Sequence, residues 1–150
     1  MRLTSCLIRF NFLEGYIMQE VLEFINNFKN HSGIPYKIER LFRSGYCYYF
    51  AYILKNAFNR GEVCWCAPLG HIVWMDTDGV PYDIEGINNS ECLEYIPIKY
   101  MGDAINDFKR TDKSFNASKS DIIQIIKNYY KDNNKTFDEN DLKYYFKGDE

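Results

Sequence analysis

Three side chains of this sequence have the types that nucleophilic catalysis needs: the thiol of Cys47, the imidazole of His71 and the carboxylate of Asp83. A thiol attacks as its thiolate, and a nearby imidazole can take the thiol proton and later return it to a leaving group. A carboxylate beyond the imidazole fixes the imidazole tautomer and supports its charged form. This chemistry requires the three residues, which are far apart in the sequence, to converge in space.

The first element that must position them is a helix that carries Cys47. Apolar residues on one stripe predict a helix from about Gly45 to Asn59, with Ser44 as its N-cap and Asn59-Arg60-Gly61 as its stop signal. In the first turn, Cys47 lies near unbonded backbone N–H groups and the positive end of the helix dipole, and both stabilise a thiolate. The stripe turns the sulfur toward the sheet, and its other members are Phe50 or Ala51, Leu54 and Phe58.

The other two residues belong to a predicted antiparallel meander. Its strands are expected at Glu62–Ala67, His71–Asp76 and Val80–Glu85, separated by Pro68-Leu69-Gly70 and by Thr77-Asp78-Gly79. In this arrangement the histidine begins the central strand and the aspartate lies on the next one.

The length of the second hairpin loop tests whether His71 and Asp83 can meet. Because side chains alternate along a strand, a two-residue loop would put them on opposite faces of the sheet. A three-residue loop, Thr77–Gly79 with Gly79 in the left-handed conformation, pairs Val73 with Asp83 and makes His71 a diagonal neighbour on the same face. A five-residue loop would put the two directly opposite each other. The triad therefore requires a loop of odd length.

The remaining elements follow from apolar spacing and capping residues. Two further helices are expected, one over Tyr16 to Asn30 and one over Ser118 to Lys131 with Ser118 as its N-cap. Shorter pieces are expected as an extended segment at Tyr36 to Phe42, an edge strand or extended loop at Leu93 to Tyr100, a short helix at Met101 to Phe108, and a last helix from Thr136 through Phe146.

The amino-terminal end allows two interpretations. Leu13 to Met18 could be encoded by a ribosome-binding sequence just ahead of a start codon, so one hypothesis is that translation begins at Met18 and that residues 1–17 are over-annotation. The other is an ordinary first strand at Cys6–Leu13. No signal peptide is predicted, because Arg9 interrupts the apolar stretch, and no apolar run approaches the roughly 20 residues of a membrane span. We therefore expect a cytoplasmic protein.

Length and composition narrow the class. The 150 residues fit one domain, residues 1–150, and a net charge of −3 argues against a general nucleic-acid binder. An odd number of cysteines does not indicate a disulfide framework, and the two histidines make a structural zinc site unexpected. We expect no metal and no cofactor. The cysteines besides Cys47 are Cys6, Cys64, Cys66 and Cys92, of which Cys64 and Cys66 share a strand face and suit packing.

Four short stretches together resemble a known superfamily. They are Gly45-Tyr46-Cys47-Tyr48-Tyr49-Phe50-Ala51, Gly61-Glu62, Gly70-His71-Ile72-Val73 and Asp78-Gly79-Val80-Pro81-Tyr82-Asp83-Ile84-Glu85-Gly86. This order resembles the core of the papain-like and transglutaminase-like cysteine enzymes, especially compact bacterial or phage members. The resemblance covers roughly residues 44–86 and implies an α+β fold in which a Cys-bearing helix packs on an antiparallel sheet. It implies Cys47 as nucleophile, His71 as general base and acid, and Asp83 as the orienting residue.

One departure from the papain pattern concerns the oxyanion. Papain-type enzymes place a glutamine upstream of the cysteine, and Arg40-Leu41-Phe42-Arg43-Ser44 contains none. The amide of Cys47 could supply one hydrogen bond to the oxyanion. The second donor stays unassigned, with Arg43 and Tyr46 as candidates.

Two functions of different classes follow. The first is a cysteine-dependent acyl-transfer enzyme of the peptidase, amidase or transglutaminase/deamidase type, acting on a peptide, protein or amide substrate through a thioester. The second is a non-catalytic binding protein of the same fold, an inhibitor or immunity-type partner from a bacterial or mobile-element genome. A third possibility, a structural accessory domain, predicts that Cys47 and His71 are not within reach of each other. The sequence leaves the substrate and the oligomeric state open, and neither nucleic acid nor membrane is an expected partner.

Overall fold

The structure, a computed structural model, describes residues 2–31, 35–43, 45–68, 70–88, 91–109, 119–136 and 138–141. In this part of the chain the helices are α1 (Arg2–His31), α2 (Pro35–Arg43), α3 (Cys47–Phe58) and α4 (Lys119–Asp132), and the 3-10 helices are η1 (Ile98–Tyr100), η2 (Gly102–Asp107) and η3 (Glu139–Asp141). The strands are β1 (Glu62–Ala67), β2 (His71–Met75), β3 (Pro81–Asp83), β4 (Gly86–Ile87) and β5 (Glu94–Pro97). They form one antiparallel sheet in the order β4-β3-β2-β1-β5. This combination confirms the α+β class.

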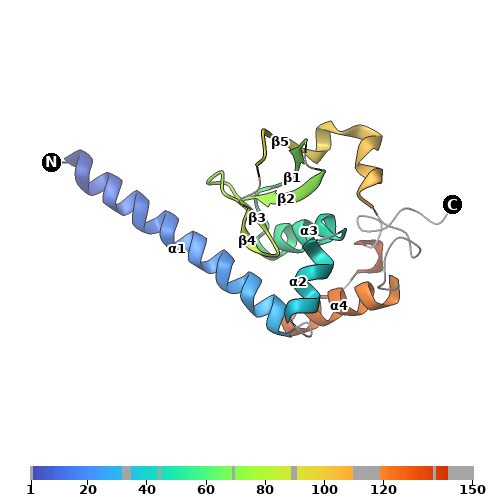
Figure 1. The fold of residues 1–150 in the computed structure, drawn as a ribbon. Helices are drawn as coiled ribbons and strands as arrows, with labels where there is room; N and C mark the ends of the chain where they lie inside the picture. The colour runs from blue at the N-terminus through green and yellow to red at the C-terminus, as the bar shows by residue number, and fades with distance from the viewer. Residues whose placement is uncertain are drawn as a thin grey trace.

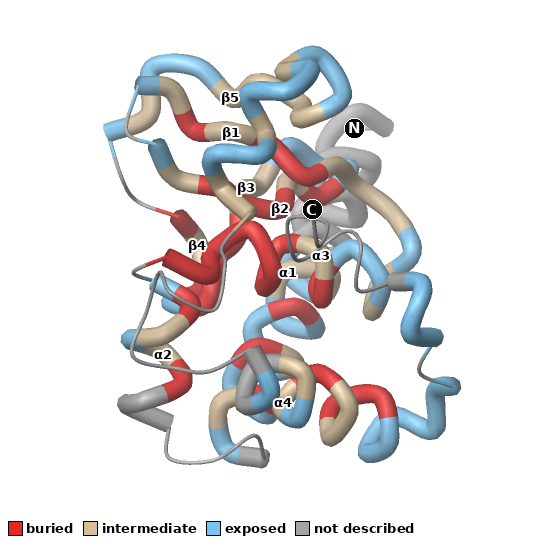
Figure 2. The backbone as a smooth tube through the Cα atoms, turned by 90° about the vertical axis from the view of Figure 1, so that its right-hand side faces the viewer, coloured by how far each residue is buried: buried red, intermediate tan, exposed pale blue. Residues whose placement is uncertain are grey.

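Helix α3 is the centre of the fold. Its sequence is apolar on nearly every side, which is typical of a helix buried all round rather than on one face. One side packs on the sheet, where the Phe58 ring stacks on Trp74 with centroids 5.4 Å apart. The other side packs on α1 and α2, where the Phe50 ring lies 5.2 Å from Phe28 and 5.7 Å from Phe42. Figure 1 shows α3 between the sheet and the helices α2 and α4, and Figure 2 shows the buried positions gathered along α3 and the central strands.

Helix α1 extends further toward the amino terminus than predicted. Its apolar face is confirmed at Val21, Ile25 and Phe28, which are all buried. The alternative strand at Cys6–Leu13 is wrong, because the backbone of these residues is helical. A short apolar run such as this one is compatible with a strand or with a helix. In the structure, the helix formed by the following residues continues back through it. The amino-terminal half of α1 projects away from the rest of the protein (Figure 1). None of the described helices combines the length and the apolar character needed to cross a lipid bilayer.

The segment Tyr36–Phe42 is helical, so the prediction of an extended segment is wrong. It lies in α2, which begins at Pro35. A proline at the first helical position suits a helix start, because its missing N–H would have no intrahelical acceptor there. Ile38 and Phe42 are four residues apart and both buried, so the helix presents one short apolar face to the core.

The register of β2 and β3 confirms the three-residue hairpin loop. Trp74 lies opposite Tyr82, and the next bonded pair closes the loop, with the Asp76 amide donating to the Val80 carbonyl at 3.0 Å. Gly79 takes the left-handed conformation with φ of 84°. The two-residue and five-residue loops are therefore wrong. The same register, extended by one residue, places Asp83 opposite Val73.

The edges of the sheet and the second half of the chain follow the expected elements in part. Strand β5 is an edge strand, as one alternative predicted, and it pairs with β1. The short helix expected at Met101 to Phe108 is the 3-10 helix η2, and α4 confirms the helix predicted up to Lys131. Ser118 lies outside the described residues. Of the helix expected from Thr136, the structure describes η3 alone, and Phe146 lies outside the described residues.

Candidate active site

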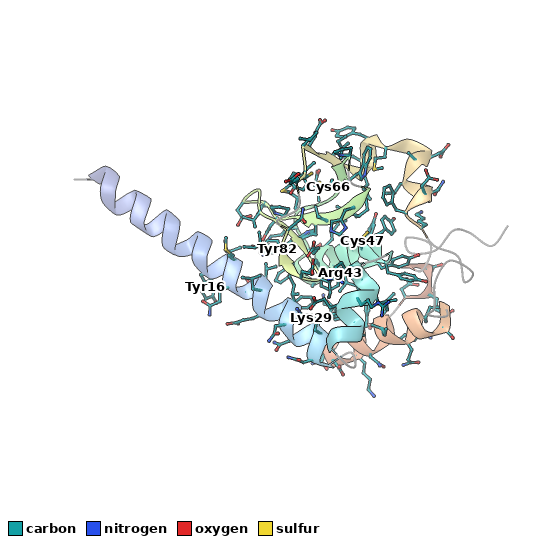
Figure 3. All side chains as sticks on the ribbon, in the orientation of Figure 1. Tyr16, Lys29, Arg43, Cys47, Cys66 and Tyr82 are labelled. Carbon is teal, nitrogen blue, oxygen red and sulfur yellow. The ribbon has the colours of Figure 1, made fainter. Side chains whose placement is uncertain are left out.

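Cys47 is the first residue of α3. Tyr46, not Ser44, holds the N-cap position and makes no side-chain capping bond, and Ser44 itself lies outside the described residues. The Tyr46 carbonyl accepts hydrogen bonds from the amides of Tyr49 and Phe50, at 3.1 and 3.3 Å. The helical ladder therefore starts one residue before the cysteine, and the Cys47 amide belongs to the first turn, whose N–H groups have no intrahelical acceptor. Figure 3 shows Cys47 at the end of α3 beside the sheet.

His71 and Asp83 are in direct contact. The Nε2 atom of His71 lies 3.0 Å from Oδ2 of Asp83. The other carboxylate oxygen, Oδ1, accepts the backbone amide of Glu85 at 2.8 Å. Because both oxygens are held, the carboxylate fixes the orientation of the imidazole and leaves Nδ1 as the nitrogen for another partner.

The imidazole also interacts with the thiol of Cys47. Burial of the imidazole is the largest single influence on the pKa of His71 and lowers it, but hydrogen bonds to Asp83 and to Cys47, with the charge attraction of both, outweigh burial. Together they raise the pKa of His71 from 6.5 to about 10. The imidazole therefore carries a proton at neutral pH, which places a cation beside the sulfur of Cys47. Cys47 is the first residue of α3 and His71 is the first residue of β2, so their contact joins the starts of these two elements.

The three residues are largely buried but not sealed. Cys47 is 8% exposed, and the side chains of His71 and Asp83 are 18% and 8% exposed. The structure thus brings together the three residues that the sequence singled out and leaves the imidazole partly open to solvent. Their catalytic role stays a prediction.

One contact next to the site was missed by the sequence. Arg43, at the end of α2, forms an ion pair with Glu85 at 3.1 Å, and both side chains are about half exposed. Its guanidinium is therefore engaged by a carboxylate two residues after Asp83, and its role as second oxyanion donor stays a prediction. Tyr46, the other candidate, is buried with its ring 4.9 Å from that of Tyr49. Neither the spacing nor the type of Arg43 and Glu85 indicates this pairing, because it depends on how α2 meets the turn after β3.

Cys64, Cys66 and Cys92 lie in the sheet or beside it. Cys64 and Cys66 are buried on β1, and the register puts Cys66 directly opposite His71, which agrees with the predicted packing role. Burial raises the pKa of the Cys64 thiol to about 11. Cys92 is half-buried, and none of Cys47, Cys64, Cys66 and Cys92 is in a disulfide. Within the described ranges, no three His, Cys, Asp or Glu side chains are grouped to hold a metal ion.

The opposite end of α3 is also tied to β2. Arg60, just after the helix, donates to both oxygens of buried Asp76, at 2.7 and 3.0 Å. The indole N–H of Trp74 donates to the Arg60 carbonyl at 2.9 Å. Gly61 then takes φ of 75°, and a Cβ there would overlap the Met75 carbonyl oxygen. Helix α3 is thus held to β2 at both ends, which fixes the position of its first turn relative to the start of the strand.

Comparison with known proteins gives one match. No curated protein and no solved structure matches the chain. A family model described as phage YunG-like protein matches residues 21–147, and the match shows no relation to the papain-like or transglutaminase-like enzymes. The matched range contains all three residues of the candidate site and leaves out most of the projecting part of α1. Because the match covers most of its length, this chain belongs to the phage YunG-like protein family.

Proposed function

We propose that this protein is a cysteine-dependent acyl-transfer enzyme on a papain-like core, with Cys47 as nucleophile, His71 as general acid and base, and Asp83 as the residue that orients His71. One observation carries the proposal: a thiol in the first turn of a helix, an imidazole and a carboxylate form a continuous chain of contacts across three elements, α3, β2 and β3. Such a chain is the arrangement that activates a cysteine nucleophile.

In the first half of the reaction, the Cys47 thiolate attacks the carbonyl carbon of an amide or thioester. A C–S bond forms and the carbonyl oxygen becomes an oxyanion. The imidazolium of His71 then gives its proton to the leaving nitrogen or sulfur as the bond from that atom to the carbonyl carbon breaks. The products are a released amine or thiol, an acyl thioester on Cys47, and a neutral imidazole that Asp83 holds in place.

In the second half, water or an amine attacks the thioester carbon. Neutral His71 takes a proton from the attacking group, the C–S bond breaks, and the sulfur leaves as thiolate beside the restored imidazolium. Water gives hydrolysis or deamidation and an amine gives transfer. The oxyanion of each half-reaction lies where the helix dipole and the Cys47 amide stabilise negative charge.

The proposal is tested by the reactivity of each cysteine toward iodoacetamide at mildly acidic pH. Cys92 is half-buried, whereas Cys47 is only 8% exposed, so access alone favours Cys92. Activation of the Cys47 thiol by His71 would make Cys47 the faster of the two cysteines. We expect Cys47 to be alkylated at least about tenfold faster than Cys92, because a paired thiolate is the reactive form of the thiol. Peptide mass mapping after timed quenching assigns the label to each residue.

Two variants sharpen this test. His71→Gln removes the imidazolium and is expected to abolish the selectivity for Cys47, while Cys64→Ser, on the neighbouring strand, leaves it unchanged.

Acetylation by p-nitrophenyl acetate then shows whether the thiolate performs acyl transfer, since intact mass detects an acetyl thioester that Cys47→Ser lacks. Equal labelling of Cys47 and Cys92 would contradict the proposal and favour the binding protein as the function.

A further inference from the structure

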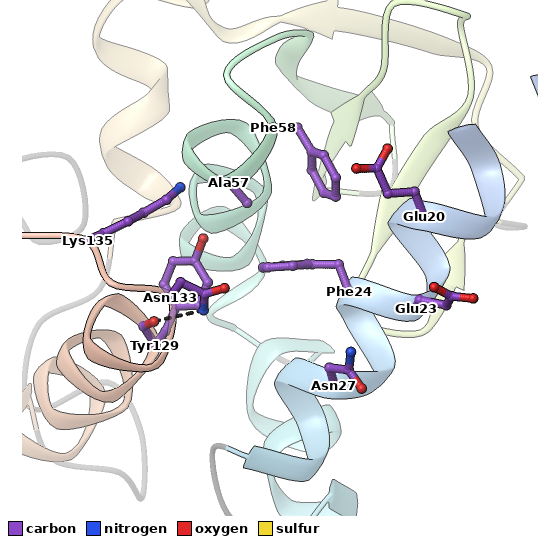
Figure 4. A pocket seen from close by; sticks show the side chains of 9 residues that line it. All are labelled: Glu20, Glu23, Phe24, Asn27, Ala57, Phe58, Tyr129, Asn133 and Lys135. Atoms are coloured by element: carbon purple, nitrogen blue, oxygen red, sulfur yellow. Dashed lines mark hydrogen bonds between the residues drawn. The ribbon is translucent and has the colours of Figure 1, made fainter. Parts of the chain in front are cut away.

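A groove opens on the surface at the opposite end of α3 from Cys47. It has a volume of about 360 Å³ and lies between α1, α3 and the end of α4 (Figure 4). Phe58 of its wall is the last residue of α3, so the groove is roughly 16 Å from Cys47 along the helix axis. None of the candidate site residues lines it.

Aromatic rings form the floor of the groove. The Phe24 ring projects from α1 and meets Phe58 edge-on, with centroids 5.4 Å apart, and Tyr129 of α4 edge-on at 5.6 Å. Figure 4 shows Phe24 extending from α1 toward α3 and α4. Three rings from three helices thus present an apolar surface that an apolar group of a ligand can cover.

The two walls of the groove carry opposite charges. Glu20 and Glu23 lie on the α1 wall, and Lys135 lies on the opposite wall, three residues after the end of α4 (Figure 4). Glu23 accepts a hydrogen bond from Gln19 at 3.0 Å, whereas Glu20 receives no side-chain hydrogen bond from the residues that the structure describes. The charge of Glu20 attracts Arg60, but the Arg60 guanidinium is already bonded to both oxygens of Asp76. The Lys135 ammonium donates to the Asn56 carbonyl at 3.0 Å, which leaves two of its three protons for another acceptor.

A buried hydroxyl beside the groove lacks a partner among the described residues. Tyr129 lines the groove and is 4% exposed, and its hydroxyl makes no hydrogen bond within the described part of the chain. Burial raises the pKa of Tyr129, so the hydroxyl stays protonated and can act as a donor. A buried donor without an acceptor is costly, which makes this hydroxyl a contact for an oxygen that is brought by a ligand.

We propose that this groove binds a small zwitterion of amino-acid or dipeptide size with an apolar side chain. The ligand ammonium contacts the Glu20 wall, the carboxylate contacts Lys135 and the Tyr129 hydroxyl, and the side chain covers the Phe24 ring. A ligand with a single charge would leave one wall unmatched. The volume lies at the small end of the roughly 300–1,000 Å³ range of ligand pockets, which suits a ligand of this size.

The ligand chemistry is tested by titrating the ¹⁵N-labelled full chain and following the amide shifts of Ala57 and Asn133. The probes are L-phenylalanine, L-phenylalaninamide, which keeps only the positive charge, and N-acetyl-L-phenylalanine, which keeps only the negative charge. We expect L-phenylalanine to bind about fivefold more tightly than either blocked form. Glycyl-L-phenylalanine decides between an amino acid and a dipeptide. Equal binding of the three phenylalanine probes, or no shift with any probe, would overturn the proposal.

Variants of the two walls locate the site. Glu20→Gln and Lys135→Met should each weaken L-phenylalanine binding about fivefold. Their matched controls, Glu91→Gln and Lys131→Met, change exposed charges outside the groove and should leave binding unchanged. If both wall variants bind as tightly as the unaltered chain, the proposal is wrong.

Tyr129→Phe gives a readout that a purely structural role would not produce. Removing an unpartnered buried hydroxyl should raise the melting temperature of the ligand-free protein, while the loss of the donor should lower the affinity for L-phenylalanine. A variant that is less stable without ligand and binds as before would overturn the role of Tyr129.

Discussion

The two ends of β2 offer a comparison, because a buried aspartate is paired with a cationic side chain at each end. At the start of the strand, Asp83 holds His71, which contacts Cys47. Beyond its end, Asp76 accepts two hydrogen bonds from Arg60. Roughly 17 Å separates the two pairs along the strand. Arg60 connects the end of α3 to the sheet through Asp76, and Cys47 connects its start to the sheet through His71, so the two pairs share a structural role.

The difference between the pairs lies in the cation. Arginine does not lose its proton in proteins, and its two parallel hydrogen bonds make the Arg60–Asp76 pair a fixed connection. Histidine can exchange a proton, so the His71–Asp83 pair can also take part in chemistry. A buried carboxylate therefore indicates a functional site only when its partner titrates and a nucleophile lies beyond it.

The largest expected effect on stability is at the arginine pair. Asp76→Asn removes the charge partner of Arg60 from a fully buried position, and we expect the free energy of unfolding to fall by about 3 kcal/mol. Urea denaturation measures the loss, and Asp103→Asn, an exposed change, is the control. In the folded variant, Cys47 should be alkylated within about twofold of the original rate. A loss below about 1 kcal/mol would show that the pair does not hold the end of α3.

The largest expected effect on reactivity is at the histidine pair. Asp83→Asn keeps the size of the side chain but removes the charge that supports the imidazolium, so alkylation of Cys47 should slow by about tenfold. The free energy of unfolding should fall by about 1–2 kcal/mol, which is less than for Asp76→Asn. Cysteine-resolved mass spectrometry with urea denaturation compares the two effects. Full reactivity of Cys47 in a destabilised variant would assign Asp83 a structural role alone.

The two pairs should respond to pH in opposite directions. The pKa of His71 is raised to about 10 in the folded state, so its stabilising contribution is complete below pH 6.5 and is lost as the pH rises through about 10. The pKa of Asp76 is lowered: burial opposes the shift, but the hydrogen bonds from Arg60 and Thr77 outweigh it. Its contribution is present above its ordinary value of 3.8 and is lost as the pH falls through the lowered value.

Unfolding free energies at several pH values separate these contributions. His71→Gln should flatten the decline of stability between about pH 6.5 and 10, and Asp76→Asn should flatten the decline at acidic pH. If His71→Gln leaves the alkaline decline unchanged, the imidazole is not held in its charged form by its neighbours.

The smallest effect is expected for the exposed ion pair beside the site. Arg43→Ala breaks a contact in which both side chains are about half exposed, so the unfolding free energy should change by less than about 1 kcal/mol. Alkylation of Cys47 should change by less than about threefold. A larger slowing, with unchanged stability, would show that Arg43 acts on the candidate site through Glu85.

Much of the site could be predicted because its constraints are local. The Asp-Gly turn, with Gly79 at positive φ, sets the loop length, and the loop length sets which side chains share a face. The apolar stripe of α3 places Cys47 in the first turn. The sequence did not indicate helix α2, because a nine-residue element offers few repeats of its pattern and a proline at the first helical position also suits the end of a preceding helix.

The sequence by itself determined the Cys-bearing helix, the meander and the need for an odd-length loop to bring His71 and Asp83 to the same face, because alternation along strands and turn chemistry act between near neighbours. Only the tertiary structure decided that Cys47 reaches His71, that Arg60 holds Asp76, and that α1, α3 and α4 enclose a groove with oppositely charged walls. These contacts depend on how whole elements pack around α3. That packing follows from the fit of many buried side chains at once, and no single stretch of sequence contains it.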